Sequence, residues 1–388
     1  MSPFTIAGEP LLPGAIPRSL TGSEEEDSRM EWVEIDGSYG EGGGQVLRTS
    51  LTLSALTGRA VRIDQIRAGR RKPGLEAQHL TGVLACARLC DAALEGARLG
   101  STTLTFAPRR PPQAGEYRFD VAEQRKGGSA GSVTLVLHTL LLPLAWAEGE
   151  SKLTVRGGTH VAWSPPYHHL ERVYFPMLAK MGLSMRGKIS RWGWYPQGGG
   201  EVTVWVHGAS RPALKPLQLE ERGALRRLWL LSAYSELPAH VGERQGRRAE
   251  SLLRQAGLHP HLEILRAPSS GIGSAVLIVA ECENVYAGFS ALGERGKPAE
   301  QVAEEACADF LAWYRSGAAV EMHLADQLIL PLALASGPSA FTTCRLTQHL
   351  LTNAWVVQHF LPVQIEVEGE EGQAGRVTVR PGPLSGAA

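Results

Sequence analysis

The chain has 388 residues, of which 43% are hydrophobic and 20% charged, a composition typical of a soluble globular protein with two domains and not of a disordered chain. Its 39 basic and 39 acidic side chains give a formal net charge of zero, which excludes wholesale wrapping of nucleic acid or of an anionic membrane. Any anion-binding site must therefore be local.

The first thirty residues contain Gly, Pro and Ser and the acidic run Glu24–Asp27. They lack the basic start and apolar stretch of an export signal, and we predict that residues 1–30 form a disordered tail or reflect a mis-assigned start before Met30. No run in the chain approaches the roughly 18 to 20 apolar residues of a spanning helix, and the five cysteines form no CxxC pair, which suits a reducing compartment. We expect a cytoplasmic protein with no membrane partner.

The first predicted block starts with a strand at 31–35, after which the glycine cluster Gly40–Gln45 opens an apolar helical stretch that ends at Thr57. Backbone amides before a helix can hold phosphate, although glycine also serves tight turns for conformational reasons alone. Glu41 favours the phosphate interpretation, because a carboxylate beside an anion is useful mainly when a metal ion bridges the two.

Four cations follow the next predicted strand. The segment Arg67–Gly74 lies between a strand at 61–66 and a helix at 75–89 that carries Gln78. Such a charge run is ordinarily solvated surface. Here its glycine and proline residues and the adjacent helix N-terminus favour phosphate binding, since guanidinium groups match phosphate oxygens bidentately. Two further strands are predicted at 102–106 and 117–121.

The second block restarts with small residues at 127–132, before an apolar helix through Ala145 and a strand at 152–155. Pro165-Pro166 begins another helix, since proline is tolerated in the first turn. The loops 157–166 and 193–201 combine glycine with tryptophan or tyrosine. They either make turns and pack in the core, or they form a platform on which a purine or an unpaired RNA base stacks.

Residues 211–318 differ in composition from the blocks around them, because they are rich in arginine and interrupted by proline. We predict that they form a smaller inserted α/β domain. A third block of repeated units follows, and 31–210 together with 319–388 then make a larger domain. Its predicted elements are a helix at 325–335, a strand at 340–344, the helix of His349 and strands at 364–367 and 376–379.

A repeated tripeptide relates the blocks. Gln78-His79-Leu80 recurs as Gln348-His349-Leu350, and His168-His169-Leu170 stands 90 residues after the first copy and 180 before the last. Such spacing indicates that one folding unit is used several times. Alternating strands and helices with strand pairs favour a layered α/β (α+β) sandwich over a purely parallel sheet.

Of the three copies, His349 is the one whose neighbours best suit a chemical role. Its neighbours are uncharged hydrogen-bonding residues, and no acidic residue occurs between Asp326 and Glu366, so we predict a neutral, nucleophilic ring. Histidine can form a covalent phosphoramidate, and the chain shows neither a Ser/His/Asp ordering nor a metal-type histidine cluster. An ordinary core or surface histidine is the alternative. Residues 323–327 carry groups able to bond ribose or base, although Asp326 could equally be a helix N-cap.

Together these motifs resemble the RNA 3'-terminal phosphate cyclase family from about Glu34 to Val379, with the main break in the inserted segment. The similarity rests on GEGGGQVLR at 40–48, IRAGRRKPGLEAQHL at 66–80, GSAGS at 128–132, GWYPQGGGEV at 193–202, HLADQLILPLALA at 323–335 and QHLLTNAWVVQHFLP at 348–362. The resemblance implies an enzyme of the ligase class that uses ATP and a divalent cation, Mg²⁺ or Mn²⁺, to convert an RNA 3'-phosphate into a 2',3'-cyclic phosphate.

In the implied mechanism His349 takes AMP from ATP, passes it to the RNA 3'-phosphate, and the neighbouring 2'-hydroxyl closes the ring and expels AMP. By the same resemblance, the residues around the phosphates and the metal are Glu41, Arg48, Arg67, Arg70 and Gln78, with Glu41 as the metal ligand. Those around AMP are His138, Pro165, His323, Leu324, Ala325, Asp326 and Gln327. His138 stands where the family usually has a glutamine.

The resemblance also implies the architecture of enolpyruvyl transferases, with three tandem units of two helices over a four-stranded sheet and a smaller inserted domain. Two other functions remain open: a non-catalytic relative in ribosome assembly or RNA processing, which lacks the nucleophile, and an enolpyruvyl transferase-like enzyme, which needs no covalent nucleotide. The sequence leaves the oligomeric state open, with a homodimer as one option.

Overall fold

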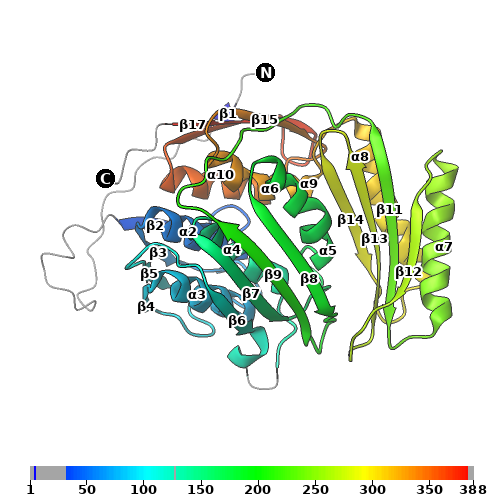
Figure 1. Ribbon diagram of the computed structural model, residues 1–388, viewed down its shortest axis with the longest axis horizontal. Helices are drawn as coiled ribbons and strands as arrows, with labels where there is room; N and C mark the ends of the chain where they lie inside the picture. The colour runs from blue at the N-terminus through cyan, green and yellow to red at the C-terminus, as the bar shows by residue number, and fades with distance from the viewer. Residues whose placement is uncertain (1–3, 6–31, 126–127, 383–388) are drawn as a thin grey trace, which may run out of the picture.

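The computed structural model describes residues 4–5, 32–125 and 128–382, which form four sheets covered by helices (Figure 1). The predicted disordered tail at 1–30 lies outside the described residues except for β1 (Phe4–Thr5), which pairs antiparallel with β16 (Val363–Glu368). No helix within the described ranges combines the length and apolar character needed to cross a membrane.

The first unit is a four-stranded sheet with two helices. Its elements in chain order are β2 (Trp32–Asp36), α2 (Gly44–Thr57), β3 (Ala60–Asp64), α3 (Ala77–Cys90), β4 (Ala93–Glu95) and β5 (Leu104–Ala107). The strand order is β2-β3-β5-β4, and only the β2–β3 pair is parallel.

The second unit repeats this topology with the strand order β6-β7-β9-β8. Its second helical segment is irregular, since a π-helical turn separates two short α-helices. Its elements are β6 (Glu116–Asp120), the 3₁₀ turn η1 (Val121–Gln124), α4 (Val133–Ala145), β7 (Gly149–Gly157), α5 (Tyr167–His169), the π turn η2 (Leu170–Tyr174), α6 (Phe175–Lys180), β8 (Ser184–Arg191) and β9 (Gly200–Gly208).

The third unit has the same strand arrangement, β10-β15-β17-β16, with β1 added at its edge. Its elements are β10 (Gln218–Leu219), α9 (Met322–Ala333), β15 (Ser339–Thr343), α10 (Gln348–Phe360), β16 and β17 (Gly375–Pro381). β10 falls inside the range 211–318 that we predicted as inserted, yet it pairs in parallel with β15. In the structure the insertion therefore interrupts the third unit after its first strand.

The inserted part has its own sheet, in the order β12-β11-β13-β14. Its elements are β11 (Leu225–Ser235), α7 (Ala239–Gln255), β12 (His261–Arg266), β13 (Gly273–Cys282), β14 (Tyr286–Leu292) and α8 (Ala299–Ser316). It joins the second unit through a small apolar cluster, in which Trp192 and Trp194 pack against Leu231, Ala275 and Leu277. The predicted α/β architecture of three units with an insertion is thus confirmed.

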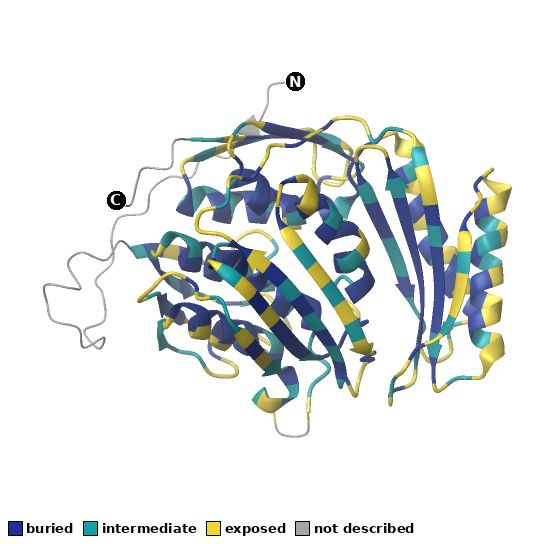
Figure 2. Ribbon diagram, viewed as in Figure 1, coloured by how far each residue is buried: buried dark blue, intermediate teal, exposed yellow. Residues whose placement is uncertain are grey.

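Side-chain patterning explains the layering. In β9 the valines at 202, 204 and 206 are buried while the residues between them are more open, as in a sheet with one covered face. α4 is buried almost throughout, because it packs on α2, α3 and its own sheet. Figures 1 and 2 show the helices of the repeated units gathered in the buried interior with the sheets outside. α10 packs on both α2 and α9, which brings segments far apart in sequence to one place.

Candidate active site

His349 lies in the first turn of α10, whose N-cap Thr347 accepts a hydrogen bond from Leu350 N at 3.1 Å. Its side chain is 46% exposed, and Nδ1 lies 2.7 Å from Glu41 Oε2 in the glycine loop before α2. This contact is close without being an aligned hydrogen bond, because Oε2 is buried and has no hydrogen-bond partner. The predicted nucleophile is therefore accessible and adjoins a carboxylate.

The glycine loop reaches α10 because its residues carry no side chains in the way. Gly40 has φ +60°, and a Cβ there would collide with Thr352 Oγ1. The next amide, Glu41 N, donates to that same oxygen at 3.3 Å. The left-handed conformation favours glycine, and the close approach fixes Glu41 beside the N-terminus of α10.

Two of the predicted arginines face this centre. Arg70 forms an ion pair with the Glu41 carboxylate and also donates to Glu41 O at 3.4 Å. Arg48, on α2, donates to Gln45 Oε1 at 2.8 Å, and burial lowers the pKa of Arg48 to about 10 against the opposing effect of Asp326. Arg67 turns back to donate to Gly74 O at 2.7 Å, and burial lowers its pKa.

The pKa of His349 is lowered, chiefly by burial, with Arg48 and Arg70 acting in the same direction and Asp326 opposing them. A neutral ring is the form that can act as a nucleophile. The prediction of a neutral ring rested on uncharged neighbours in sequence, but the structure adds the carboxylates of Glu41 and Asp326 from other elements. The lowered pKa comes from burial and arginine, not from a lack of acids.

Helix α9 supplies the residues beside His349. Its N-cap is Glu321, whose carboxylate accepts from His323 N and Leu324 N, both at 2.7 Å, so the alternative role of Asp326 as an N-cap is wrong. Burial raises the pKa of Asp326 to about 6, while the nearby His349 and His323 oppose the rise. Leu324 and Ala325 lie in the hydrophobic core, which leaves only their backbone groups for a ligand.

Among the buried side-chain polar atoms that have no hydrogen-bond partner within the described residues are four from the three repeated units: Glu41 Oε2, His138 Nε2, His169 Nε2 and Gln327 Oε1. These residues are close enough to interact through their charges. Arg48 and His169 both lower the pKa of His138, and His323 lowers the pKa of His169. An unpaired buried polar atom costs about 1 to 3 kcal/mol. A polar ligand or water that pairs with these atoms would remove that cost.

Two further predicted residues accept hydrogen bonds, Gln78 between the first and second units and Pro165 within the second unit. Gln78 Oε1 accepts from Ser132 N at 2.7 Å, and Pro165 O accepts from Thr134 Oγ1 at 2.7 Å. Both bonds hold loops of the second unit against their neighbours. The acceptor of Gln78 is thus already engaged, while its amide nitrogen has no bond within the described residues.

His79 was not predicted as a site residue, although it stands in the repeated tripeptide that would have drawn attention to it. Its Nδ1 accepts from Glu76 N at 3.1 Å, and a Cβ on Gly44 would collide with its Nε2. Burial lowers the pKa of His79 to about 3, with Arg48 and Arg67 adding to the effect. This neutral ring packs directly under the glycine loop and the arginines.

The metal prediction rests on Glu41 alone. Within the described ranges no group of three or more His, Cys, Asp or Glu residues is arranged to hold a metal ion. One oxygen of Glu41 is bound by Arg70 and the other has no hydrogen-bond partner. The residues present therefore fit a divalent cation only if most of its ligands come from substrate and water, as is usual for Mg²⁺ bound with phosphates.

Comparisons with known proteins cover the whole site. A sequence model of the RNA 3'-terminal phosphate cyclase family matches residues 39–367, a range that contains every predicted site residue. An RNA 3'-terminal phosphate cyclase from Gloeothece citriformis is 49% identical over 350 residues, covering 90% of this chain and 99% of that protein. An RNA 3'-terminal phosphate cyclase from Methylococcus capsulatus is 51% identical over 356 residues, covering 91% of this chain and 98% of that protein.

Among solved structures, the enolpyruvyl transferase NikO from Streptomyces tendae aligns with 46% of this chain and 33% of its own, at 14% identity and a TM-score of 0.26. That likeness is too low to support an argument. The match to the family model and the two cyclases, in contrast, extends over nearly the full length. This chain belongs to the RNA 3'-terminal phosphate cyclase family.

Proposed function

We propose that the protein converts an RNA 3'-phosphate end into a 2',3'-cyclic phosphate at the expense of ATP, through a covalent His349–AMP intermediate. The main support is the arrangement around His349, whose accessible ring has one nitrogen against Glu41 and adjoins two arginines and unpaired buried polar atoms. The five free cysteines suit a reducing compartment, and we assign the activity to the cytoplasm.

The first step uses the two ring nitrogens differently. Because a lone pair on Nδ1 would be repelled by the Glu41 carboxylate 2.7 Å away, we assign the ring proton to Nδ1 and the lone pair to Nε2. Nε2 attacks the α-phosphorus of ATP, an N–P bond forms, and pyrophosphate leaves with the electrons of the broken P–O bond. The lowered pKa of His349 keeps this lone pair available at neutral pH.

The triphosphate needs compensating charge. Arg48 and Arg70 supply it beside His349, and guanidinium groups remain charged even at the lowered pKa of about 10 for Arg48. Glu41 would hold a divalent cation, Mg²⁺ or Mn²⁺, whose charge stabilises the phosphates when it is bound. The unpaired polar atoms of His138 and Gln327, with Asp326 and His323, are the groups for ribose and base.

The remaining steps involve RNA. An oxygen of the RNA 3'-phosphate attacks the phosphorus of the histidine-bound AMP, and the broken N–P bond returns its electrons to Nε2. The 2'-hydroxyl then attacks the activated 3'-phosphorus, its proton passes to solvent, and AMP leaves with the electrons of the broken P–O bond. This requires the hydroxyl that distinguishes RNA from DNA.

Labelling with ATP that carries ³²P at the α-position tests the proposal. We expect the wild-type protein to become labelled in the presence of a divalent cation, with a bond that is acid-labile and alkali-stable. His349→Ala should abolish the label. The matched control is His359→Ala, because His359 lies on the same helix but bonds Trp355 O at 2.8 Å away from Glu41. A wild type that takes no label would refute the enzyme proposal, and a label retained in His349→Ala would refute the assigned nucleophile.

A further inference from the structure

Two large aromatic side chains, on the loops 157–166 and 193–201, project into solvent. Trp163 is 99% exposed and Tyr195 is 77% exposed, the two highest values among the large hydrophobic residues described. Trp163 also has φ +63°, a left-handed conformation that is uncommon for bulky residues. Strained backbone of this kind concentrates at ligand-binding positions, so exposure and strain together single out this residue.

The two loops that carry these rings are bound to each other. Thr159 N donates to Gly193 O at 2.9 Å, and Gly193 N returns a bond to Thr159 Oγ1 at 2.9 Å. Within the loops, Gly198 N donates to Trp194 O at 2.7 Å and Ser164 Oγ to Val161 O at 3.1 Å. Both turns are thus held in shape, and a rigid aromatic group loses little conformational entropy when a ligand binds.

Both loops also lead directly to proposed site residues. Trp163 stands two residues before Pro165, whose carbonyl is bonded to Thr134. The Tyr195 turn rests on the glycine segment of the second unit, because a Cβ on Gly198 would come within 2.8 Å of Ser129 O. That same segment is bonded to Gln78 through Ser132 N. Each loop is therefore connected, through a short series of residues and contacts, to Pro165 or Gln78.

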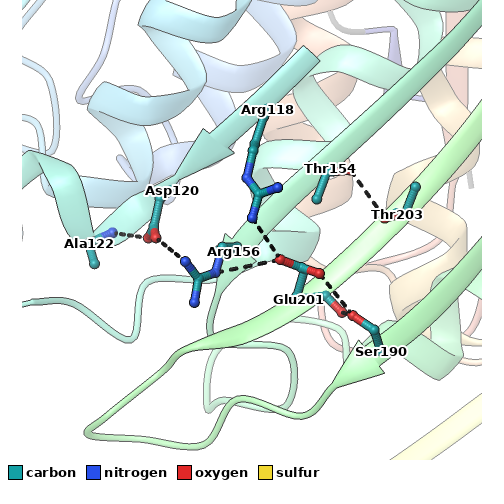
Figure 3. Close-up of polar contacts among 8 residues, drawn as sticks. All are labelled: Arg118, Asp120, Ala122, Thr154, Arg156, Ser190, Glu201 and Thr203. Atoms are coloured by element: carbon teal, nitrogen blue, oxygen red, sulfur yellow. Dashed lines mark hydrogen bonds and ion pairs between the residues drawn. The ribbon is translucent and has the colours of Figure 1, made fainter. Parts of the chain in front are cut away.

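The charges next to these loops are balanced or positive. Figure 3 shows Arg118 and Arg156 pairing with Asp120 and Glu201, at 3.1 Å for Arg118–Glu201 and 3.6 Å for both Arg156 contacts. Their carboxylates are thereby neutralised. On the adjacent strand β8, Lys188 and Arg191 are exposed and form no ion pair with any described residue. A phosphate backbone meets no net repulsion here.

We infer that Trp163 and Tyr195 form a stacking platform for the unpaired nucleotides just upstream of the RNA 3'-phosphate, with Lys188 and Arg191 compensating their backbone charge. This rests on the proposed function, because the substrate end is RNA only if that proposal holds. Aromatic side chains stack on any base, whatever its identity. Unpaired bases have ring faces free for such stacking, whereas the bases of a duplex are stacked on one another. The platform therefore selects an unpaired end without reading its sequence.

Binding and kinetics with the full-length protein test the platform. A fluorescent single-stranded RNA with a 3'-phosphate serves as the probe, and its affinity without ATP and its KM with ATP are measured. We expect Trp163→Ala and Tyr195→Ala each to weaken binding and raise KM by about fivefold or more. Trp163→Phe and Tyr195→Phe should retain most of the wild-type affinity. Self-labelling by ATP in the absence of RNA should stay unchanged in all four variants.

A matched control is Trp205→Ala. Trp205 belongs to the sheet of the second unit and not to the two loops, and its ring packs against Arg186. The substitution should leave RNA binding as in the wild type. Equal losses in the control, or variants that bind single-stranded RNA like the wild type while still labelling with ATP, would overturn the platform and leave the proposed function standing. A wild type that neither labels nor binds the RNA would instead count against the proposed function itself.

Discussion

At the scale of single residues, three histidines occupy related positions and differ in environment. His79, His169 and His349 each stand in the first turn of the second helical segment of a unit. His79 and His169 are 7% and 6% exposed, whereas the His349 side chain is 46% exposed. The repeated tripeptide in the sequence contains all three histidines. Their solvent exposure distinguishes His349, which a substrate can reach, from His79 and His169, which pack in the interior.

The pH dependence of labelling should show how Asp326 influences His349. Asp326 opposes the lowering of the His349 pKa, so Asp326→Asn should lower that pKa further. Because the neutral ring is the reactive form, the acidic limb of the pH–rate profile should move to lower pH in the variant. NMR titration of the ring and initial labelling rates measure this, with the alkaline limb as an internal reference. A shift toward higher pH would contradict the assigned charge interaction.

At the scale of elements, the contact between the glycine loop and α10 builds the site. No single element contains His349, Glu41 and Arg70, which come from α10, the loop before α2 and the loop before α3. A chain of bonds also holds the helices in register: Thr49 Oγ1 donates to Asn353 Oδ1 and Asn353 Nδ2 to Asp326 O, both at 2.7 Å. The geometry of the site therefore depends on how α2, α9 and α10 pack.

Gly40→Ala tests this contact. The added methyl group would collide with Thr352 Oγ1 at a position of positive φ, so we expect it to displace Glu41 and reduce labelling by about tenfold or more, in line with the sensitivity of catalysis to small misplacements. Gly58→Ala is the control, because Gly58 has φ +75° but open space around it. It should cost about 1 to 2 kcal/mol of stability and leave the labelling rate unchanged. Equal labelling by both variants would argue against a steric role for Gly40.

At the scale of the whole molecule, histidines buried without charge are spread over the first two units. Burial is the main cause that lowers the pKa of His79, His138, His168 and His169 to about 3, and it lowers that of His160 well below its ordinary value. The pair His160–His168, joined at 3.0 Å, lies beside Trp192 at the junction with the inserted part. These neutral rings make folding dependent on pH.

Stability should therefore fall in acid. A histidine whose folded pKa is depressed contributes stability that is complete above its unfolded value near 6.5 and lost as pH falls toward about 3. Each ring contributes a slope of up to about 1.4 kcal/mol per pH unit over that range. His138→Gln should reduce the slope of the free energy of unfolding between pH 6.5 and 5 by about that amount, as measured by urea denaturation. An unchanged slope would mean that His138 is not buried in its neutral form.

The sequence predicted much of the fold because the relevant signals are local. Glycine turns and apolar periodicity predicted most strands and helices of the first two units to within a few residues, but the strands β4, β8 and β9 were not predicted. The boundary of the insertion depended on a distant partner, because Gln218–Leu219 is too short to be recognised as a strand until it pairs with β15. In the inserted part α7 and β12 were not predicted, since α7 is rich in arginine and buries mainly small or polar residues, and β12 is largely exposed.

By itself the sequence determined the repeated α/β units, the histidine worth attention and the cations near a glycine loop, because periodicity, glycine content and charge are properties of adjacent residues. Tertiary structure alone decided that Glu41 lies against His349, that Glu321 and not Asp326 caps α9, and that the polar atoms of His138, His169 and Gln327 remain unpaired. The physical reason is that pKa, access and hydrogen-bond pairing depend on packing between residues hundreds of positions apart, and no local pattern encodes which of them meet.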